Sequence, residues 1–290
     1  MPTAEQSRRA MLILGMHRSG TSAFARGMQA LGVYLGNNFL STRPDNPTGY
    51  WEDRNICELN ERLLAVFGLK WTDVSLIHEA RWREPAVQSL RSEAVEYLRA
   101  NFRGRSLWGY KDPRTIRLLP FWQSVLRYLE VDECYLVAIR NPLSVAASLF
   151  QRQGMDTVTA HRLWLVYMVP YLGAIANRRF VVADYDLLMA GPQGELERIA
   201  RALEIPLDES TLAEIQRFTA DFLDSNLRHN LFSEYDFEPT LNLTPLAREA
   251  YLWLRQLATD RIAHDSSRFW EAWERSRRAV DALLSEPGAA

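Results

Sequence analysis

The sequence predicts an α/β fold in which a central, mainly parallel sheet lies between two layers of helices. The first observation is a short apolar run, 11–14, that breaks into a glycine-bounded loop and continues as a helical pattern over 22–31. The second is that three further apolar runs each lead into helical spacing; these runs are 106–110, 134–139 and 179–183. Strands that alternate with helices are typical of parallel βαβ units in three-layer domains.

The loop after the first run has the spacing of a phosphate-binding loop. Gly15 and Gly20 enclose four residues, and Ser22 has the position of the hydroxyl in the pattern G-x-x-x-x-G-[KST]-[ST]. Thr21 replaces the usual lysine, and Arg18 supplies a cation before the second glycine. Backbone N–H groups in such a turn, with a helix N-terminus behind them, attract an anion. We expect a P-loop-containing fold that binds a phosphate here; a turn without a ligand is the alternative.

The composition is that of an ordinary soluble globular protein. The chain has 290 residues, of which 47% are hydrophobic and 24% charged, and its net charge of −2 gives no general attraction to nucleic acids or anionic membranes. We expect one domain with a flexible N-terminus at 1–10, an α/β core at 11–240 and a helical C-terminal extension at 241–284.

Cysteine usage and hydropathy favour the cytoplasm. Cys57 and Cys134, the two cysteines, are far apart in the chain, so neither a disulfide framework nor a zinc site is expected. The apolar stretch 163–176 is too short for a membrane span and contains Pro170. The polar N-terminus does not have the pattern of an export signal. We therefore expect no integral membrane segment.

The segment after the first helix is long and irregular, because 32–49 is rich in asparagine, glycine and proline. Helical apolar spacing resumes over 55–67. Glu52 and Asp53 stand just before this helix, where an acidic residue either caps the helix or serves catalysis. The sequence leaves both roles open.

A second helix is predicted over 85–102, and the strand 106–110 follows it. Ligands bind outside the carboxyl ends of parallel strands, so Lys111 is expected at the same edge as the glycine loop. Lys111 and Lys70 are the two lysines among 34 basic residues, which suggests a chemical reason for a lysine here. Pro113 should open the next helix, with Asp112 as its cap.

The strand 134–139 ends in Arg140, and a helix is expected through Leu149. A nucleotide triphosphatase would hold magnesium with an aspartate at such a strand end. An arginine repels a metal ion and attracts a second phosphate. Ser148, two helical turns further on, is close enough to assist the same anion.

The rest of the chain is predicted to be mostly helical. We expect one long core helix over 157–176, then the last strand, followed by helices over 194–203 and 211–219. A polar stretch, 223–230, contains Arg228, which we include among the ligand-binding residues. Two amphipathic helices rich in tryptophan and arginine are expected over 246–284, as a packing surface or the face of a homodimer.

Together these motifs resemble those of sulfotransferases that use 3′-phosphoadenosine 5′-phosphosulfate (PAPS), of the bacterial kind related to tyrosylprotein and carbohydrate sulfotransferases. The resemblance covers most of 11–230. The run His17-Arg18-Ser19-Gly20-Thr21-Ser22 resembles the family's loop for the 5′-phosphosulfate. Arg140-Asn141-Pro142 with Ser148 resembles the R-[DN]-P…S motif for the 3′-phosphate.

Three further segments are similar to motifs of this family. Asp184-Tyr185-Asp186-Leu187 looks like the Y-E-D-L segment, whose tyrosine, here Tyr185, lies near the adenosine in relatives. Lys111-Asp112-Pro113 is similar to the K-D-P of the tyrosylprotein branch, where the lysine assists transfer, and Glu52 matches that branch's catalytic glutamate by order. The loop between Arg18 and Glu52 is longer than in those relatives, and the K-x-H histidine of cytosolic aryl sulfotransferases is absent.

The resemblance implies in-line, metal-free transfer of a sulfuryl group from PAPS to an acceptor hydroxyl, with PAP as the product. Backbone amides, Arg18 and Lys111 would stabilise charge on the 5′-phosphate oxygen, and Glu52 would take the acceptor's proton. The acceptor is expected to be a carbohydrate or another small molecule; a lipid headgroup, a phenol and a peptide tyrosine also fit.

Two other functions fit part of the pattern. A P-loop kinase could use Asp184 as its metal-holding acid, although the loop lysine that reaches the transferred phosphate is missing. A non-catalytic nucleotide-binding or scaffolding protein would use the C-terminal helices as its partner surface.

Overall fold

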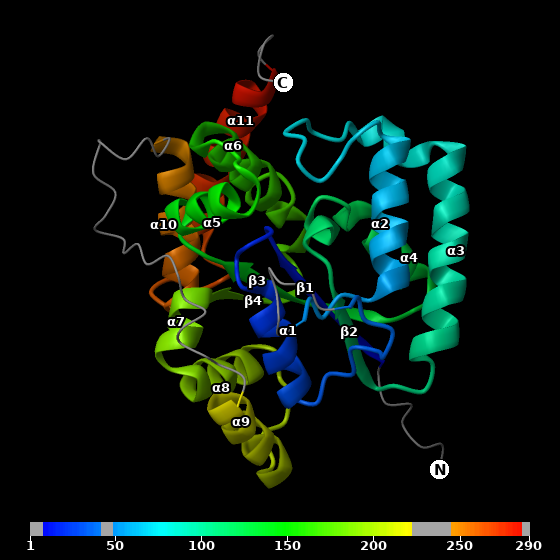
Figure 1. The fold of residues 1–290 in the computed structure, drawn as a ribbon, viewed down its shortest axis with the longest axis vertical. Coiled ribbons are helices and arrows are strands. Elements are labelled where there is room, and N and C mark those ends of the chain that lie inside the picture. Colours follow the sequence, from blue (N-terminus) through cyan, green and yellow to red (C-terminus); the bar gives the residue numbers. More distant parts are fainter. Residues whose placement is uncertain (1–7, 42–48, 222–244, 286–290) are drawn as a thin grey trace.

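The computed structural model describes residues 8–41, 49–221 and 245–285, and its centre is a four-stranded parallel sheet (Figure 1). The strand order is β2-β1-β3-β4. The bounds are β1 Arg9–Gly15, β2 Leu107–Lys111, β3 Asp132–Ile139 and β4 Arg179–Asp184. All neighbouring pairs are parallel, with Ile13 opposite Lys111, Gly15 opposite Ala138 and Ile139 opposite Asp184. The register therefore brings all four carboxyl ends to one edge of the sheet.

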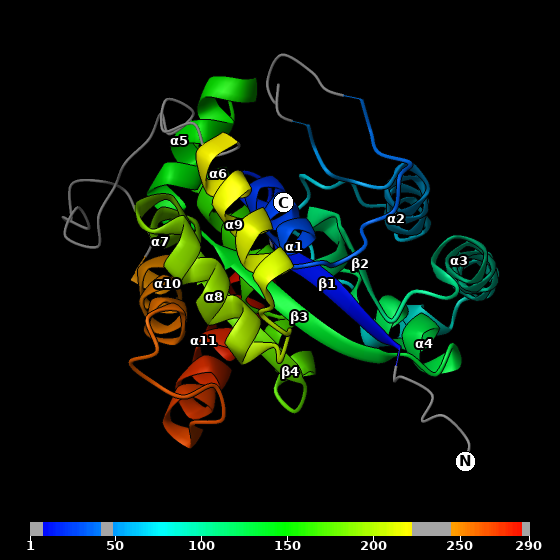
Figure 2. The same ribbon diagram turned by 90° about the horizontal axis from the view of Figure 1, so that it is seen from below.

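Each strand is buried on both faces because helices cover the sheet from either side (Figure 2). Met11 and Ile13 of β1 face one core cluster, and Leu12 and Leu14 face the other. The first cluster includes side chains of α1 (Thr21–Ala30), α7 (Tyr185–Ala190), α8 (Pro192–Ala202) and α9 (Glu209–Asp221). The predicted three-layer α/β fold is confirmed.

The second core cluster is larger and includes the remaining α-helices. These are α2 (Arg54–Val66), α3 (Pro85–Phe102), α4 (Leu119–Tyr128), α5 (Pro142–Gln153), α6 (Thr157–Met168), α10 (Pro245–Ala258) and α11 (Ser267–Ser285). Short 3-10 helices lie at η1 (Glu79–Arg83), η2 (Pro113–Ile116) and η3 (Leu172–Ile175). The helical C-terminal extension was also predicted correctly.

The prediction of one long helix over 157–176 is wrong. Helix α6 ends at Met168, and the chain re-forms only the short turn η3. Pro170 lies in the gap, and a proline has no N–H to continue the helical hydrogen bonds. Helix α7, which directly follows β4, was not expected either.

Short polar side chains fix where the helices around the sheet edge begin. Asp112 accepts a hydrogen bond from the backbone N of Arg114 and caps η2, as the sequence predicted. Asp53, rather than Glu52, caps α2 by accepting from the backbone N of Asn55 and Ile56. Asp112 therefore caps the short helix after β2, and Asp53 caps α2. The side chains of the neighbouring residues, Lys111 and Glu52, are not used for capping.

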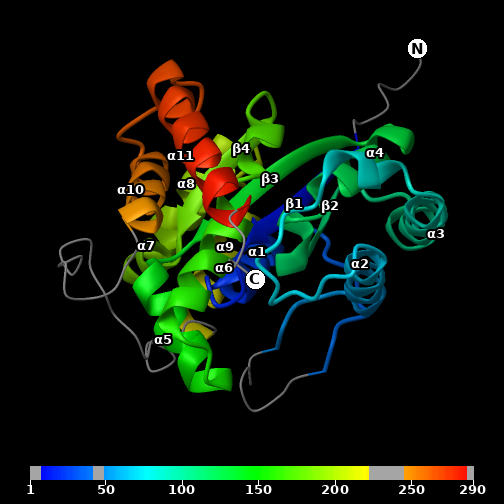
Figure 3. The same ribbon diagram turned by 90° about the horizontal axis from the view of Figure 1, so that it is seen from above.

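The C-terminal helices pack against the outer strand β4, on the side of the molecule away from α2 and α3 (Figure 3). The fully buried carboxylate of Asp184 connects them to the sheet. Its Oδ2 accepts hydrogen bonds from Arg255 at 2.8 Å and from the Tyr251 hydroxyl at 3.0 Å, and its Oδ1 caps α7. Among the described residues, no helix is both long and apolar enough to cross a membrane.

Asp184→Asn should lower the free energy of unfolding by about 3 kcal/mol, because it leaves the Arg255 guanidinium without its buried counter-charge. Urea denaturation measures this change. Asp281→Asn is the matched control, since it breaks a half-exposed pair with Arg277 in α11 and should cost less than about 1 kcal/mol. Equal effects of the two substitutions would show that Asp184 does not hold the C-terminal helices.

Candidate functional site

The glycine loop lies at the carboxyl edge of the sheet, between β1 and α1. Arg18 and Gly20 have positive φ angles of 69° and 77°, so the backbone turns sharply before α1 begins. A Cβ atom on Gly20 would lie 2.1 Å from Cδ2 of Tyr185, which means that only glycine allows this ring to pack against the loop. The loop, the helix N-terminus and Tyr185 therefore form one wall of the site.

Two arginines connect this loop to the end of β3. The Nε of Arg18 donates to the Ser148 hydroxyl at 2.8 Å, which links the loop to α5. Arg140 donates from Nη1 to the carbonyl of Arg18 at 3.3 Å, and its guanidinium lies 4.8 Å from the ring centre of Tyr185. The residues predicted for two different phosphates are thus neighbours. Both arginines therefore bring positive charge to the loop.

Two buried hydroxyl groups near these arginines have no hydrogen-bond partner. They are the Oγ atoms of Ser19, in the loop, and Ser144, in the first turn of α5. Buried polar atoms are rarely left unpaired in a protein unless a ligand or water uses them. An anion with several oxygens fits this cradle of hydroxyl donors, helix N-termini and arginines. Ser144 was not among the predicted site residues. Its place three residues after Asn141, in the turn that follows a strand, could have indicated it.

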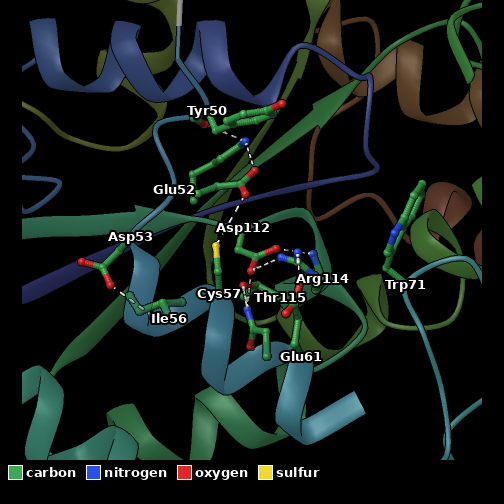
Figure 4. Close-up of polar contacts among 12 residues, drawn as sticks. Tyr50, Glu52, Asp53, Ile56, Cys57, Glu61, Trp71, Asp112, Arg114 and Thr115 are labelled. Carbon is green, nitrogen blue, oxygen red and sulfur yellow. Dashed lines mark hydrogen bonds and ion pairs between the residues drawn. The ribbon is translucent and has the colours of Figure 1, made fainter. Parts of the chain in front are cut away.

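The second part of the site is a buried ion pair between β2 and the segment before α2 (Figure 4). The ammonium Nζ of Lys111 lies 2.5 Å from Oε1 of Glu52, 2.9 Å from the carbonyl oxygen of Tyr50 and 3.3 Å from the Ser22 hydroxyl. The exposed fractions of the Lys111 and Glu52 side chains are 2% and 8%. The two predicted catalytic residues are therefore held together, and Lys111 also contacts the start of α1.

The other oxygen of Glu52 is also engaged. The thiol of Cys57, one turn into α2, donates to Oε2 at 3.5 Å. Burial, followed by the negative charges of Asp112 and Glu52, raises the pKa of the Cys57 thiol, so the group keeps its proton. Glu52 is thus fixed from two sides.

A neighbouring network holds the aspartate that follows Lys111. Asp112 is fully buried and accepts from Arg114 Nη1 at 2.7 Å and from Asn60 Nδ2 at 3.0 Å. Burial alone would raise the pKa of this carboxyl, but the charge of Arg114 and the hydrogen bonds outweigh burial, and the pKa is lowered. The Oδ1 of Asn60 accepts in turn from Trp122 at 2.8 Å. This network gives β2 a rigid end.

The charges at this edge do not suit a divalent metal ion. Among the described residues, Glu52, Cys57 and Asp112 place ligand atoms within 4.8 Å of one another. Lys111 and Arg114 already pair with the two carboxylates, and a metal ion would have to displace these cations. Asp184, the acid that a kinase would need, is fully paired with Arg255 and Tyr251.

The ring of His17, the first residue of the predicted donor loop motif, packs against two aromatic residues. Its imidazole lies 4.4 Å from the ring centre of Trp71 and 5.7 Å from that of Tyr167. The Tyr167 hydroxyl donates to the carbonyl of Trp71 at 2.9 Å, so the two aromatic residues form a fixed clamp. Burial lowers the pKa of His17, and the charges of Arg114 and Lys111 add to this effect. Trp71 and Tyr167 could not be predicted as neighbours of His17, because they come from distant segments of the chain.

The structure brings most of the predicted site residues to one edge. These are His17, Arg18, Ser19, Gly20, Thr21, Ser22, Glu52, Lys111, Arg140, Ser148 and Tyr185. Arg228 lies outside the described residues. Cys57 and Cys134 are free and buried.

Comparison with solved structures finds similar chains. One is the sulfotransferase domain of the Synechococcus PCC 7002 olefin synthase, with 18% identity over 99% of this chain and 98% of that chain and a TM-score of 0.44. A second is sulfotransferase STF9 from Mycobacterium avium, with 15% identity over 88% of this chain and 76% of that chain and a TM-score of 0.46. A third is retinol dehydratase in complex with retinol and PAP, with 12% identity over 99% of this chain and 84% of that chain and a TM-score of 0.36.

Comparisons at the level of sequence find no match, either to a protein-family model or to a curated protein.

The buried pair of Lys111 and Glu52 should be strongly coupled. Lys111→Met or Glu52→Gln alone leaves one buried charge without its partner and should cost about 3–5 kcal/mol of stability. The double variant removes both charges, so its loss should be at least about 2 kcal/mol smaller than the sum. Chemical denaturation of the four proteins gives this coupling free energy.

The half-exposed pair of Arg62 and Glu93 provides the control for this cycle, because its charges are hydrated. Its double-mutant cycle should be additive to within about 1 kcal/mol. If the double-mutant cycle of Lys111 and Glu52 were additive as well, the two residues would not be coupled through a buried ion pair.

Proposed function

We propose that the protein transfers a sulfuryl group from PAPS to the hydroxyl group of an acceptor and releases PAP. The observation that carries this proposal is the charge arrangement at the sheet edge. A phosphate-binding loop stands beside Arg140 and the ion pair of Lys111 and Glu52, and the acids near it are already paired with cations. Such a site favours a polyanion that comes without a metal ion.

The loop and its neighbours would hold the donor at both ends. The N–H groups of the loop, with Arg18 and the buried Ser19 hydroxyl, fit the 5′-phosphosulfate. Arg140, Ser148 and the buried Ser144 hydroxyl fit the 3′-phosphate, and the ring of Tyr185 offers a flat surface for the adenine. In this proposal Arg228 is a further donor-binding residue.

Lys111 and Glu52 would act together at the reacting sulfur. The ammonium of Lys111 lies 3.3 Å from the hydroxyl of Ser22 at the start of α1, beside the expected position of the bridging oxygen. A fixed cation there stabilises the charge that develops on the departing 5′-phosphate. Glu52 keeps this cation in place, and by motif it is also the candidate base. The acceptor is proposed to be a carbohydrate or another small molecule.

The proposal also covers the compartment and the oligomeric state of the protein. Free, buried thiols at Cys57 and Cys134 agree with a reducing cytoplasm. A homodimer through the C-terminal helices stays a prediction.

The kinase alternative is disfavoured because Asp184 is paired with Arg255 in the core. A non-catalytic nucleotide-binding protein would also use the donor cradle, and only turnover separates it from an enzyme.

The test of this function is binding first and turnover second. PAP in the presence of EDTA should raise the melting temperature, and a concentration of about 100 times its Kd stabilises the folded protein by about 2.7 kcal/mol. ATP with magnesium should have little effect. Sulfur-labelled PAPS offered with a panel of glycans, phenols, alcohols and tyrosine peptides should label at least one acceptor.

Stabilisation by magnesium–ATP, with none by PAP, would overturn the sulfotransferase proposal in favour of a kinase. Binding of PAP without turnover on any acceptor of the panel would favour the non-catalytic alternative.

Arg140→Ala should weaken PAP about 10- to 100-fold more than it weakens adenosine 5′-monophosphate, which lacks the 3′-phosphate. The reason is the loss of a charge-assisted contact to that phosphate. Some loss for both ligands is expected, since Arg140 also holds the Arg18 carbonyl. Calorimetric titration measures the two affinities, with Arg277→Ala in α11 as a distant control. Equal losses for both ligands would make Arg140 a purely structural residue of the loop.

A further inference from the structure

Both carboxylate oxygens of Glu52 are already engaged by neighbouring groups. One carboxylate oxygen lies 2.5 Å from the ammonium of Lys111, and the other accepts from the Cys57 thiol. Glu52 is 6% exposed, so protonation would leave the charge of Lys111 buried without its partner. A base of the reaction should be able to gain a proton without breaking the site. The group that takes the proton of the acceptor is therefore to be sought elsewhere.

His17 has the chemistry that Glu52 lacks. Its Nε2 is buried and has no hydrogen-bond partner, although the residue as a whole is partly exposed. The clamp of Trp71 and Tyr167 fixes the plane of its ring. A buried ring nitrogen without a partner is uncommon in proteins and leaves room for a ligand group or a water molecule to bind there. The backbone of His17 belongs to the donor loop, but its side chain lies with the aromatic residues.

The charged groups around His17 determine when it can accept a proton. Burial lowers its pKa first, and Arg114, Lys111 and Arg152 lower it further, while Asp112 raises it. The imidazole is therefore neutral at pH 7 and keeps a free lone pair. A polyanion in the adjacent loop offsets the charges of these cations, so donor binding should raise the pKa of His17. Proton acceptance would then become easier only when the donor is in place.

We propose that His17 is the base that takes the proton from the acceptor hydroxyl, and that Glu52 positions Lys111. This inference rests on the sulfotransferase function proposed above. In the step, the acceptor oxygen forms a bond to sulfur while the bond from sulfur to the bridging oxygen breaks. The electron pair of that bond stays on the 5′-phosphate, where Lys111 stabilises it. The acceptor proton passes to the imidazole of His17 and from there to water.

The inference also defines the acceptor class that depends on His17. An alcohol or sugar hydroxyl is un-ionised at neutral pH and needs a base, whereas a phenol that is already ionised does not. His17 is therefore required for un-ionised acceptors. The indole of Trp71, which is partly exposed and lies against the His17 ring, offers a flat surface beside the reacting hydroxyl.

The test compares His17→Ala, Glu52→Gln and the control His264→Ala; His264 is exposed in the connection between α10 and α11. With the acceptor that the wild-type protein sulfates, kcat of His17→Ala should fall about 100- to 1,000-fold, while the Kd for PAP changes less than about threefold. Added imidazole should restore at least about a tenth of the lost activity in His17→Ala. It should restore none in Glu52→Gln. His264→Ala should behave as the wild type.

A second measurement is independent of turnover. In the NMR titration of the histidine rings, PAP should raise the pKa of His17, whose signal is identified by its absence in His17→Ala, and the ring signals of His264 should not change when PAP is added. Activity of His17→Ala or His17→Asn within about threefold of the wild type would overturn the inference. Imidazole rescue of Glu52→Gln would return the role of base to Glu52. If the wild-type protein sulfates no acceptor, the proposed function itself fails, and the two failures are thus distinguishable.

Discussion

The ammonium group of Lys111 joins three segments of the candidate site. It stands at the end of β2 and contacts Glu52, the carbonyl of Tyr50 and the hydroxyl of Ser22. A buried ammonium needs such partners, and Glu52 would be an unpaired charge without it. The Lys111 ammonium therefore ties the segment before α2 to the start of α1, together with the hydrogen bond that the Ser22 hydroxyl donates to the carbonyl of Tyr50. A compact ammonium can direct donors to three separate partners, whereas a planar guanidinium cannot take the same place. This explains a lysine at this position in a chain whose other basic residues, apart from Lys70, are arginines.

The same principle of paired charges extends along the sheet edge. Asp112 is paired with Arg114, and Asp184 is paired with Arg255. These acids are paired with cations, and Arg18 and Arg140 bring further positive charge to the loop. A metal-dependent phosphotransferase needs the reverse arrangement, in which free carboxylates hold the ion.

The aromatic side of the site is rigid for a separate reason. Trp71 lies in the connection between α2 and η1, which has little secondary structure of its own. The fully buried Arg117 donates hydrogen bonds to the carbonyls of Asp73 and Ser75 at 2.8 and 2.7 Å. These bonds hold the connection in place. Tyr167 holds the carbonyl of Trp71 from α6. The side chain of His17 is thus positioned by residues from three distant parts of the chain.

Local patterns in the sequence determined much of this protein. Apolar runs of strand length, helical spacing and the spacing of Gly15 and Gly20 predicted the sheet, the helices and the loop, because each depends on residues close together in the chain. The rule that ligands bind at the carboxyl ends of parallel strands then placed Arg140 and Lys111 at one edge. Asp112 was correctly predicted as a cap for the same local reason.

Only the tertiary structure decided which side chains meet at that edge. The sequence could not tell whether Glu52 or Asp53 caps α2; the structure assigns the cap to Asp53 and pairs Glu52 with a lysine 59 positions away. It could not show that Asp184 is neutralised by Arg255 of α10, or that Trp71 and Tyr167 enclose His17. Pairing of buried charges and packing of aromatic rings depend on contacts between distant segments. No periodicity or motif spacing along the chain records those contacts.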